Sequence, residues 1–281
     1  MTSTSSSSTV PDRGDTLLVK AIERDRLILV TGVAVIVAAA WAWLLLGAGM
    51  DEGPMSHHGM PTMPGMAEMT RPTAWTPAYA GLMLSMWWIM MVAMMLPSAA
   101  PMLLLFAKIN RREREHERPY VRTSVFAAGY LLVWGVFSVL ATAVQWALER
   151  AGLLMSMSSS SMWLGGALLV GAGLWQLTPL KGACLRHCRS PIAFLSHGWR
   201  GGRVGALRMG VEHGAYCLGC CWFLMALLFF GGIMNLYWII GLAVYVLLEK
   251  TIPMGHWVAR TAGVGLLGWG LVVLWSAAVM T

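Results

Sequence analysis

Apolar residues occur in long runs that short polar segments separate. Each run is about 20 residues long, which is the length that an α-helix needs to cross a hydrocarbon core of ~30 Å. The pattern therefore predicts an all-α fold, a polytopic bundle of six to seven transmembrane helices, with about seven as the preferred number. The predicted helices cover residues 27–49, 78–106, 123–148, 162–180, 204–230, 235–250 and 260–280.

The composition agrees with this pattern. Hydrophobic residues make up 57% of the 281 residues and charged residues 12%, against about 25% charged residues in soluble domains. Residues 1–26 are largely polar and Ser-rich, so they are predicted to form a disordered cytoplasmic tail. Residues 27–281 are predicted to form a single transmembrane helical domain that has the lipid bilayer as its main partner.

Lysine and arginine predict the orientation of the bundle. Of the 20 such residues, all but Arg71 and Arg150 fall on one side of the predicted helices, and positively charged loops stay in the cytoplasm. We therefore expect a multi-pass protein of the cell (inner) membrane, with its N-terminus cytoplasmic and its C-terminus outside. This asymmetry explains the net charge of +7, so nucleic-acid binding is not expected.

The first candidate metal site is the polar segment between the first two predicted helices, which is expected outside the membrane. Thioether sulfur suits Cu(I) and imidazole suits Cu(II) and zinc, so a loop that offers both could capture copper in either oxidation state. The alternative is a loop that is Met-rich without a function. The candidate ligands are His57, His58, Met60, Met63 and Met66.

A row of methionines in the predicted helix 78–106 is the second candidate. At helical spacing these side chains form two adjacent rows, which could make a thioether ladder for Cu(I). Methionine also fills gaps in apolar cores, so packing alone is the other interpretation. Pro97 frees a carbonyl of the preceding turn, and such carbonyls in a bundle usually line a cavity or a site. The candidate ligands are Met90, Met91, Met94 and Met95.

The third and most specific candidate lies on the fifth predicted helix, which contains the segment VEHGAYCLGCCW. Its members follow at positions i, i+4, i+7 and i+8, so they share one stripe of the helix. Thiolate and imidazole select zinc or copper, whereas a structural interpretation would make each cysteine a small buried hydrophobic residue. Glu212 beside the stripe is costly in lipid, which favours a function. The stripe consists of His213, Cys217, Cys220 and Cys221.

The segment CLRHC, expected just inside the cytoplasm, is the fourth candidate. It places Cys184 and Cys188 one helical turn apart, with His187 between them. Cytosolic thiols stay reduced and available to metal. The fifth predicted helix begins on the same side, so the two cysteine groups could converge. They could also form two sites in series or act as a redox pair.

Two further features are interpreted as structural. Closely spaced glycines, such as Gly173 and Gly263, let helix backbones approach one another in lipid. Glu249 and Lys250 end the predicted helix 235–250, where a lysine interacts favourably with the C-terminal dipole. Neither feature is assigned chemistry.

Four segments carry a family resemblance. They read WWIMMVAMMLPSAAPM, QLTPLKGACLRHCRSP, GVEHGAYCLGCCWFLMALLFFGGIMNL and VLLEK. They are similar to the family of predicted metal-binding integral membrane proteins called domain of unknown function 2182, over roughly residues 27–275. The resemblance implies a metal site but no assured reaction or substrate, and it does not extend to the loop at 55–66. The implied site combines the methionine-rich helix with Cys184, Cys188, His213, Cys217, Cys220 and Cys221.

Together these motifs favour an inner-membrane protein that handles copper, by transport or delivery of Cu(I), with zinc as a second candidate metal. Its partners would be the metal ion and a soluble or membrane metalloprotein. One alternative is a membrane oxidoreductase that uses copper or a cysteine pair, and another is a structural or assembly subunit without metal. No catalytic residue is assigned and a non-enzymatic role is favoured. The chain has no phosphate-binding G-x-x-x-x-G-K-[ST] motif, so any transport would not be driven by its own ATP hydrolysis.

Overall fold

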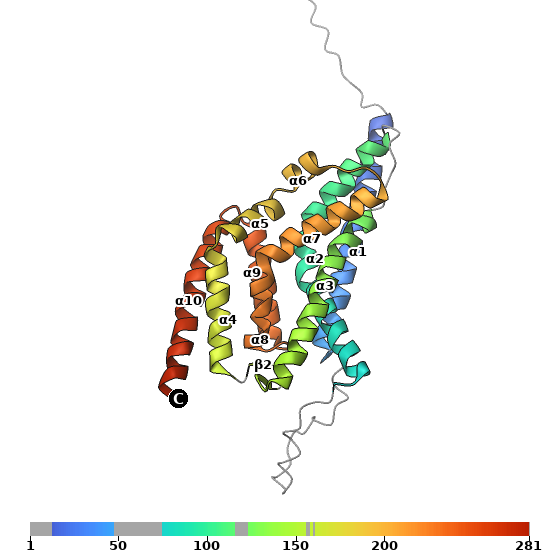
Figure 1. The fold of residues 1–281 in the computed structure, drawn as a ribbon. Helices are drawn as coiled ribbons and strands as arrows, with labels where there is room; N and C mark the ends of the chain where they lie inside the picture. Colours follow the sequence, from blue (N-terminus) through green and yellow to red (C-terminus); the bar gives the residue numbers. More distant parts are fainter. Residues whose placement is uncertain (1–12, 48–74, 116–122, 156–157, 160, 281) are drawn as a thin grey trace, which may run out of the picture.

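The fold is an all-α helical bundle, as the hydrophobic pattern predicts (Figure 1). The computed structural model describes residues 13–47, 75–115, 123–155, 158–159 and 161–280. Within these residues, seven helices have 16 residues or more and three are shorter. The long helices are α1 (Arg13–Leu45), α2 (Pro77–Glu115), α3 (Thr123–Arg150), α4 (Met162–Leu177), α7 (Gly202–Ala226), α9 (Leu236–Thr251) and α10 (Gly255–Met280).

Short elements connect the long helices. They are α5 (Pro179–Arg189), α6 (Pro191–Gly198), α8 (Leu228–Gly231) and an antiparallel pair of two-residue strands, β1 (Leu154–Met155) and β2 (Ser158–Ser159). Helices α5 and α6 lie in the basic segment after the fourth predicted helix, where the sequence predicts only polar connecting residues. Thr178 explains the start of α5, because its hydroxyl accepts a hydrogen bond from the Lys181 backbone N–H and caps the helix in front of Pro179.

Five helices in the described part of the chain are long and apolar enough to cross a membrane. They are Arg26–Leu45, Pro77–Arg111, Thr123–Arg150, Gly202–Gly231 and Gly255–Met280. Helices α4 and α9, which the sequence predicts as two further spans, have 16 residues each. At 1.5 Å per residue they are about 24 Å long, which is shorter than a hydrocarbon core of ~30 Å.

Local signals explain why α4 and α9 are short. Helix α4 stops where Thr178 and Pro179 begin α5. Before α9 the chain turns at Gly232, which has a φ of 97° that a residue with a Cβ rarely adopts. Asn235 then caps α9 by accepting a hydrogen bond from the Tyr237 backbone N–H, and Pro253 follows the end of α9.

Two helices extend beyond their predicted ends. Helix α1 begins at Arg13, ahead of the predicted start at residue 27. Helix α2 continues to Glu115, beyond the expected end at residue 106. The α1 extension contains Leu, Lys, Arg and Glu and the α2 extension Lys, Arg and Glu, which favour helix, and each is continuous with an apolar helix that nucleates it.

The long helices pack in two groups (Figure 1). Helices α4 and α10 lie side by side at one edge, α1, α2 and α3 lie at the other, and α7 packs against α3 and α5. Glycine permits the closest of these contacts, because a Cβ on Gly210 of α7 would collide with the Phe126 carbonyl of α3. Gly173 of α4 and Gly263 of α10 face each other's backbone in the same way, so the packing interpretation of these glycines is confirmed.

Candidate metal centre

Three thiols of α7 form the centre of the candidate site. Cys217, Cys220 and Cys221 are at most 1% exposed, so α7 turns the predicted stripe into the core of the bundle. The thiols of Cys220 and Cys221 donate to the backbone carbonyl of Cys217, at 3.0 and 2.9 Å. All five cysteines are free, so every thiol remains available as a ligand.

Helix α5 brings the other two cysteines to this group. The Cys188 side chain interacts with Cys217 and Cys220, and Cys184 packs against α7, with its Sγ 3.0 Å from the position that a Cβ on Gly219 would occupy. Helix α5 lies outside the five candidate spans. Hydrogen bonding to Cys217 and Cys220 raises the pKa of the Cys188 thiol, and burial raises the pKa of the Cys184 thiol.

One methionine of α2 reaches the thiols. The Sγ of Cys221 lies 4.0 Å from the Sδ of Met95, which adds a thioether to the cluster. Met90, Met91 and Met94 are at most 2% exposed and belong to the same apolar core. They place further soft donors inside the bundle on the helix that carries Met95.

Two polar side chains that the sequence analysis missed contact Cys217. The Tyr130 hydroxyl of α3 lies 3.1 Å from the Cys217 Sγ and donates to the Met95 carbonyl at 3.1 Å. The Lys250 Nζ of α9 donates to the Cys217 Sγ at 2.9 Å and to the Ser98 hydroxyl at 3.1 Å. Lys250 therefore lies at the thiol cluster, beyond the helix-end role that the sequence suggested. The signal was an ionisable residue in an apolar helix, which usually marks a functional position.

A buried ion pair joins Glu249, the residue before Lys250 on α9, to Lys181 of α5. Glu249 and Lys181 are 0% and 1% exposed, and the Lys181 Nζ lies 2.5 Å from a Glu249 carboxylate oxygen. Lys181 also donates to the Gln176 side chain, which donates in turn to the Tyr245 hydroxyl at 2.7 Å. These contacts tie α4, α5 and α9 together beside the cluster.

His213 lies on α7 one turn before Cys217, among aromatic rings. It is 3% exposed, stacks on Tyr130 with ring centroids 5.7 Å apart, and contacts Phe126 and Phe194. Its Nδ1 has no hydrogen-bond partner among the described residues. A buried unpaired imidazole nitrogen is costly in an apolar core, so this atom is a further available donor.

Two residues of the predicted sites point elsewhere. His187 is exposed and stacks on Tyr216 at 4.2 Å, so it is not brought to the cysteines between which it lies in the sequence. Glu212 pairs with Arg200 at 2.9 Å and Arg208 at 3.3 Å, and all three side chains are partly exposed. The two arginines therefore neutralise the charge of the Glu212 carboxylate, which faces the basic start of α7 and not the thiols.

The predicted loop site lies outside the described residues. Its members are His57, His58, Met60, Met63 and Met66, all within the undescribed segment 48–74. The candidate centre therefore rests on the helices alone.

Comparison with known protein families decides the class of metal chemistry. The family PpoB2, described as copper chaperone, matches residues 84–273. The chain belongs to this copper chaperone family. The matched region includes Met95, the five cysteines and Lys250, whereas it leaves out α1 and the loop at 55–66. No curated protein and no solved structure matches the chain.

The donor set suits the metal of the copper chaperone family. Thiol and thioether sulfur are soft ligands that select Cu(I), and the cluster combines four thiols of α5 and α7 with the Met95 thioether. In the described ranges, no three or more His, Cys, Asp or Glu side chains are arranged to hold a metal ion as they stand. Lys250 and Tyr130 instead hold the Cys217 sulfur through hydrogen bonds.

Proposed function

We propose that this member of the copper chaperone family is an inner-membrane protein that binds Cu(I) in the thiol cluster and delivers it to a metalloprotein partner. The cluster is defined as Cys188, Cys217, Cys220 and Cys221 with the thioether of Met95. The family supports copper handling, and five helices of suitable length and apolarity support a place in the membrane.

The observation that carries the proposal is the meeting of sulfur atoms from three helices. Cys221 of α7 lies 4.0 Å from the Met95 sulfur of α2, and Cys188 of α5 interacts with Cys217 and Cys220 of α7. Cysteines used only for packing would not need to converge from separate segments or to attract a lysine. Thioether and thiolate ligands together favour Cu(I) over zinc, which prefers thiolate and imidazole.

Lys250 gives the metal-free cluster a counter-cation. Its ammonium group contacts the Cys217 sulfur at 2.9 Å and would stabilise negative charge there. Cu(I) is also a monovalent cation, so an ion that binds the Cys217 sulfur would replace the positive charge of the Lys250 ammonium group with its own. The cysteine side chains would have to rearrange around the ion, because in the described residues no three or more His, Cys, Asp or Glu side chains are arranged to hold a metal as they stand.

Transfer would proceed by ligand exchange. His213 lies one turn from Cys217, and its Nδ1 has no hydrogen-bond partner in the described part of the chain. Cys184 lies on α5 and packs against Gly219 of α7. These groups could take over the ion on its way to or from the basic end of the bundle. The predicted Met/His loop at 55–66 would supply copper ligands at the opposite end.

The test is the metal content of full-length protein purified in mild detergent under reducing, anaerobic conditions. Wild-type protein is expected to carry close to one copper per chain after exposure to Cu(I), and the triple variant Cys217→Ser/Cys220→Ser/Cys221→Ser to lose most of it. His187→Ala is the matched control, because His187 is a candidate ligand whose ring stacks on Tyr216 and is exposed. Zinc in place of copper, or equal copper in wild type and triple variant, would refute the proposal. Size-exclusion profiles establish that each variant is folded.

A further inference from the structure

The Lys250 ammonium group reaches the thiol cluster from α9. It donates to the Cys217 sulfur at 2.9 Å and to the Ser98 hydroxyl at 3.1 Å. In the described part of the chain no carboxylate lies within ion-pair distance of it, whereas the buried Lys181 is paired with Glu249. A cation inside a bundle is costly unless negative charge compensates it, so the sulfur has to supply that compensation.

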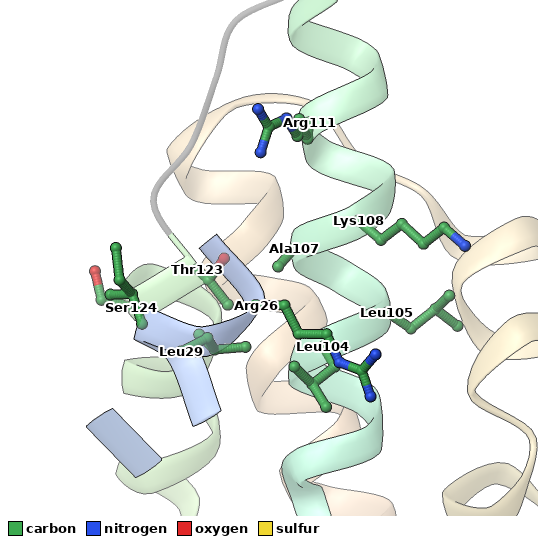
Figure 2. Close-up of a pocket in the computed structure, with 10 residues that line it drawn as sticks. Arg26, Leu29, Leu104, Leu105, Ala107, Lys108, Arg111, Thr123 and Ser124 are labelled. Atoms are coloured by element: carbon green, nitrogen blue, oxygen red, sulfur yellow. The ribbon is translucent and has the colours of Figure 1, made fainter. Parts of the chain in front are cut away.

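Cations elsewhere in the bundle are arranged differently. Arg26, Lys108 and Arg111 surround a pocket of about 590 Å³ that α1, α2 and α3 form, and their side chains point in different directions (Figure 2). They do not converge on one ligand. Lys250 differs from them because its charged atom lies in contact with a sulfur of the proposed copper site.

The hydrogen bond to Ser98 holds the ammonium group beside the cluster independently of Cys217. Ser98 lies on α2 and donates its hydroxyl proton to the Met95 carbonyl at 2.8 Å, so its oxygen is left to accept from Lys250. The Met95 carbonyl also accepts from the Tyr130 hydroxyl at 3.1 Å. A metal ion that displaces Lys250 from the sulfur would therefore leave the ammonium group bonded to Ser98, about one turn of α2 from Met95.

We propose that Lys250 makes the thiol cluster selective for a monovalent over a divalent metal ion, an inference that rests on the proposed copper function. Thiolates also bind zinc, so the cysteines alone do not exclude it. The ammonium group keeps one positive charge near the bound ion, and at a given distance it repels a divalent ion twice as strongly as a monovalent one. The interior of a bundle screens this repulsion less than water does. Lys250 therefore disfavours Zn(II) more than Cu(I).

The test compares the Cu(I) and Zn(II) affinities of full-length protein in mild detergent under reducing, anaerobic conditions, each measured by competition with a chelator. Lys250→Met keeps an unbranched side chain and removes the charge. The ratio of zinc affinity to copper affinity is expected to rise at least about tenfold in this variant. Loss of the ammonium group also makes Cys217 harder to deprotonate, but that cost applies to both metals and cancels in the ratio.

Three further variants isolate the charge and its position. Lys250→Arg keeps the charge and should retain the wild-type ratio. Ser98→Ala keeps the lysine but releases it from α2, so the ratio should rise by less than in Lys250→Met. Arg203→Gln removes one charge from the exposed start of α7 and should leave the ratio unchanged.

The outcomes separate this inference from the copper function. An unchanged ratio in Lys250→Met or in Ser98→Ala, with copper bound to wild-type protein, would overturn the inference and leave the copper function standing. An equal rise in Arg203→Gln would also overturn it, because net charge and not the position of Lys250 would then set the selectivity. Wild-type protein that binds no Cu(I), or that binds zinc as tightly, would refute both.

Discussion

Cys217 is the residue at which contacts from three other helices meet. Its sulfur accepts a hydrogen bond from Lys250 of α9, pairs with the Tyr130 hydroxyl of α3 and interacts with Cys188 of α5. Cysteine is usually a small buried hydrophobic residue in a helix, and such a residue attracts no ammonium group. The partners of Cys217 therefore favour a negatively charged thiolate, which is the form that binds a metal cation.

Met95 tests whether the thioether takes part in binding. Met95→Leu keeps the volume of the side chain, so the fold should be retained at a cost below about 1.5 kcal/mol. Loss of the sulfur next to Cys221 should weaken Cu(I) binding by roughly tenfold, as loss of a supporting metal contact commonly does. The measurement is a Cu(I) titration against a competing chelator. Met102→Leu, in the apolar cluster with Phe106 and Phe126, is the control and should bind as wild type does.

The ion pair between Lys181 and Glu249 makes a separate prediction about stability. Either Lys181→Met or Glu249→Leu alone leaves one uncompensated charge in a fully buried position, which should cost about 3–5 kcal/mol of unfolding free energy. The double variant removes both charges and should recover most of that loss. Denaturant unfolding in detergent measures the three variants against wild type. Additive losses would mean that the two side chains are not coupled.

Helix α7 shows at the element scale which parts of the site the sequence predicts. Spacing of i, i+4 and i+7 places His213, Cys217 and Cys220 on one stripe whatever the surrounding helices do, so these residues could be found. Lys250 lies 33 positions after Cys217, and its contact depends on how α9 packs. Local periodicity holds no information about such a contact.

Helix lengths were predicted less well than helix existence. Helix α4 ends at Leu177, before its predicted end at residue 180, because Thr178 caps it, and a hydropathy pattern does not detect such a cap. The charged extensions of α1 and α2 are helical because their residues favour helix, although an apolar pattern assigns them to a tail and a loop. Hydropathy locates apolar helices, whereas caps and propensity set where each begins and ends.

The close contact of α3 and α7 holds the cluster together and can be tested at Gly210. A Cβ there would collide with the Phe126 carbonyl, which is backbone and cannot turn aside. Gly210→Ala should therefore lower the free energy of unfolding by about 1–3 kcal/mol and weaken copper binding as α7 shifts. Gly241→Ala in α9 is the matched control, because its Cβ would meet nothing within 4 Å, and it should be neutral or stabilising.

At the scale of the whole molecule, the two ends of the bundle differ in charge and in expected surroundings. The start of α1 and the end of α10 lie at opposite ends of the bundle (Figure 1), which is compatible with an N-terminus inside and a C-terminus outside. Helices α5 and α6 lie at the same end as the start of α1. This arrangement places Cys184 and Cys188 at the basic end, which the distribution of lysine and arginine predicts to be cytoplasmic.

Reporter fusions test this orientation. A reporter enzyme that is active only outside the cytoplasm should be active when fused after Thr281, and a fluorescent protein that folds only inside should be dark there. The same pair fused at the N-terminus should give the opposite result. A C-terminal fusion that fluoresces would reverse the orientation and place the Met/His loop in the cytoplasm.

X-ray absorption spectroscopy on protein loaded with one equivalent of Cu(I) tests the central claim most directly, because it reports which atoms bind the metal. The account predicts a ligand shell dominated by sulfur in wild-type protein. It predicts fewer sulfur ligands, or no retained copper, in Cys217→Ser/Cys220→Ser. A shell of nitrogen and oxygen alone in wild-type protein, or a sulfur shell that this variant leaves unchanged, would contradict the assignment of Cu(I) to the thiol cluster.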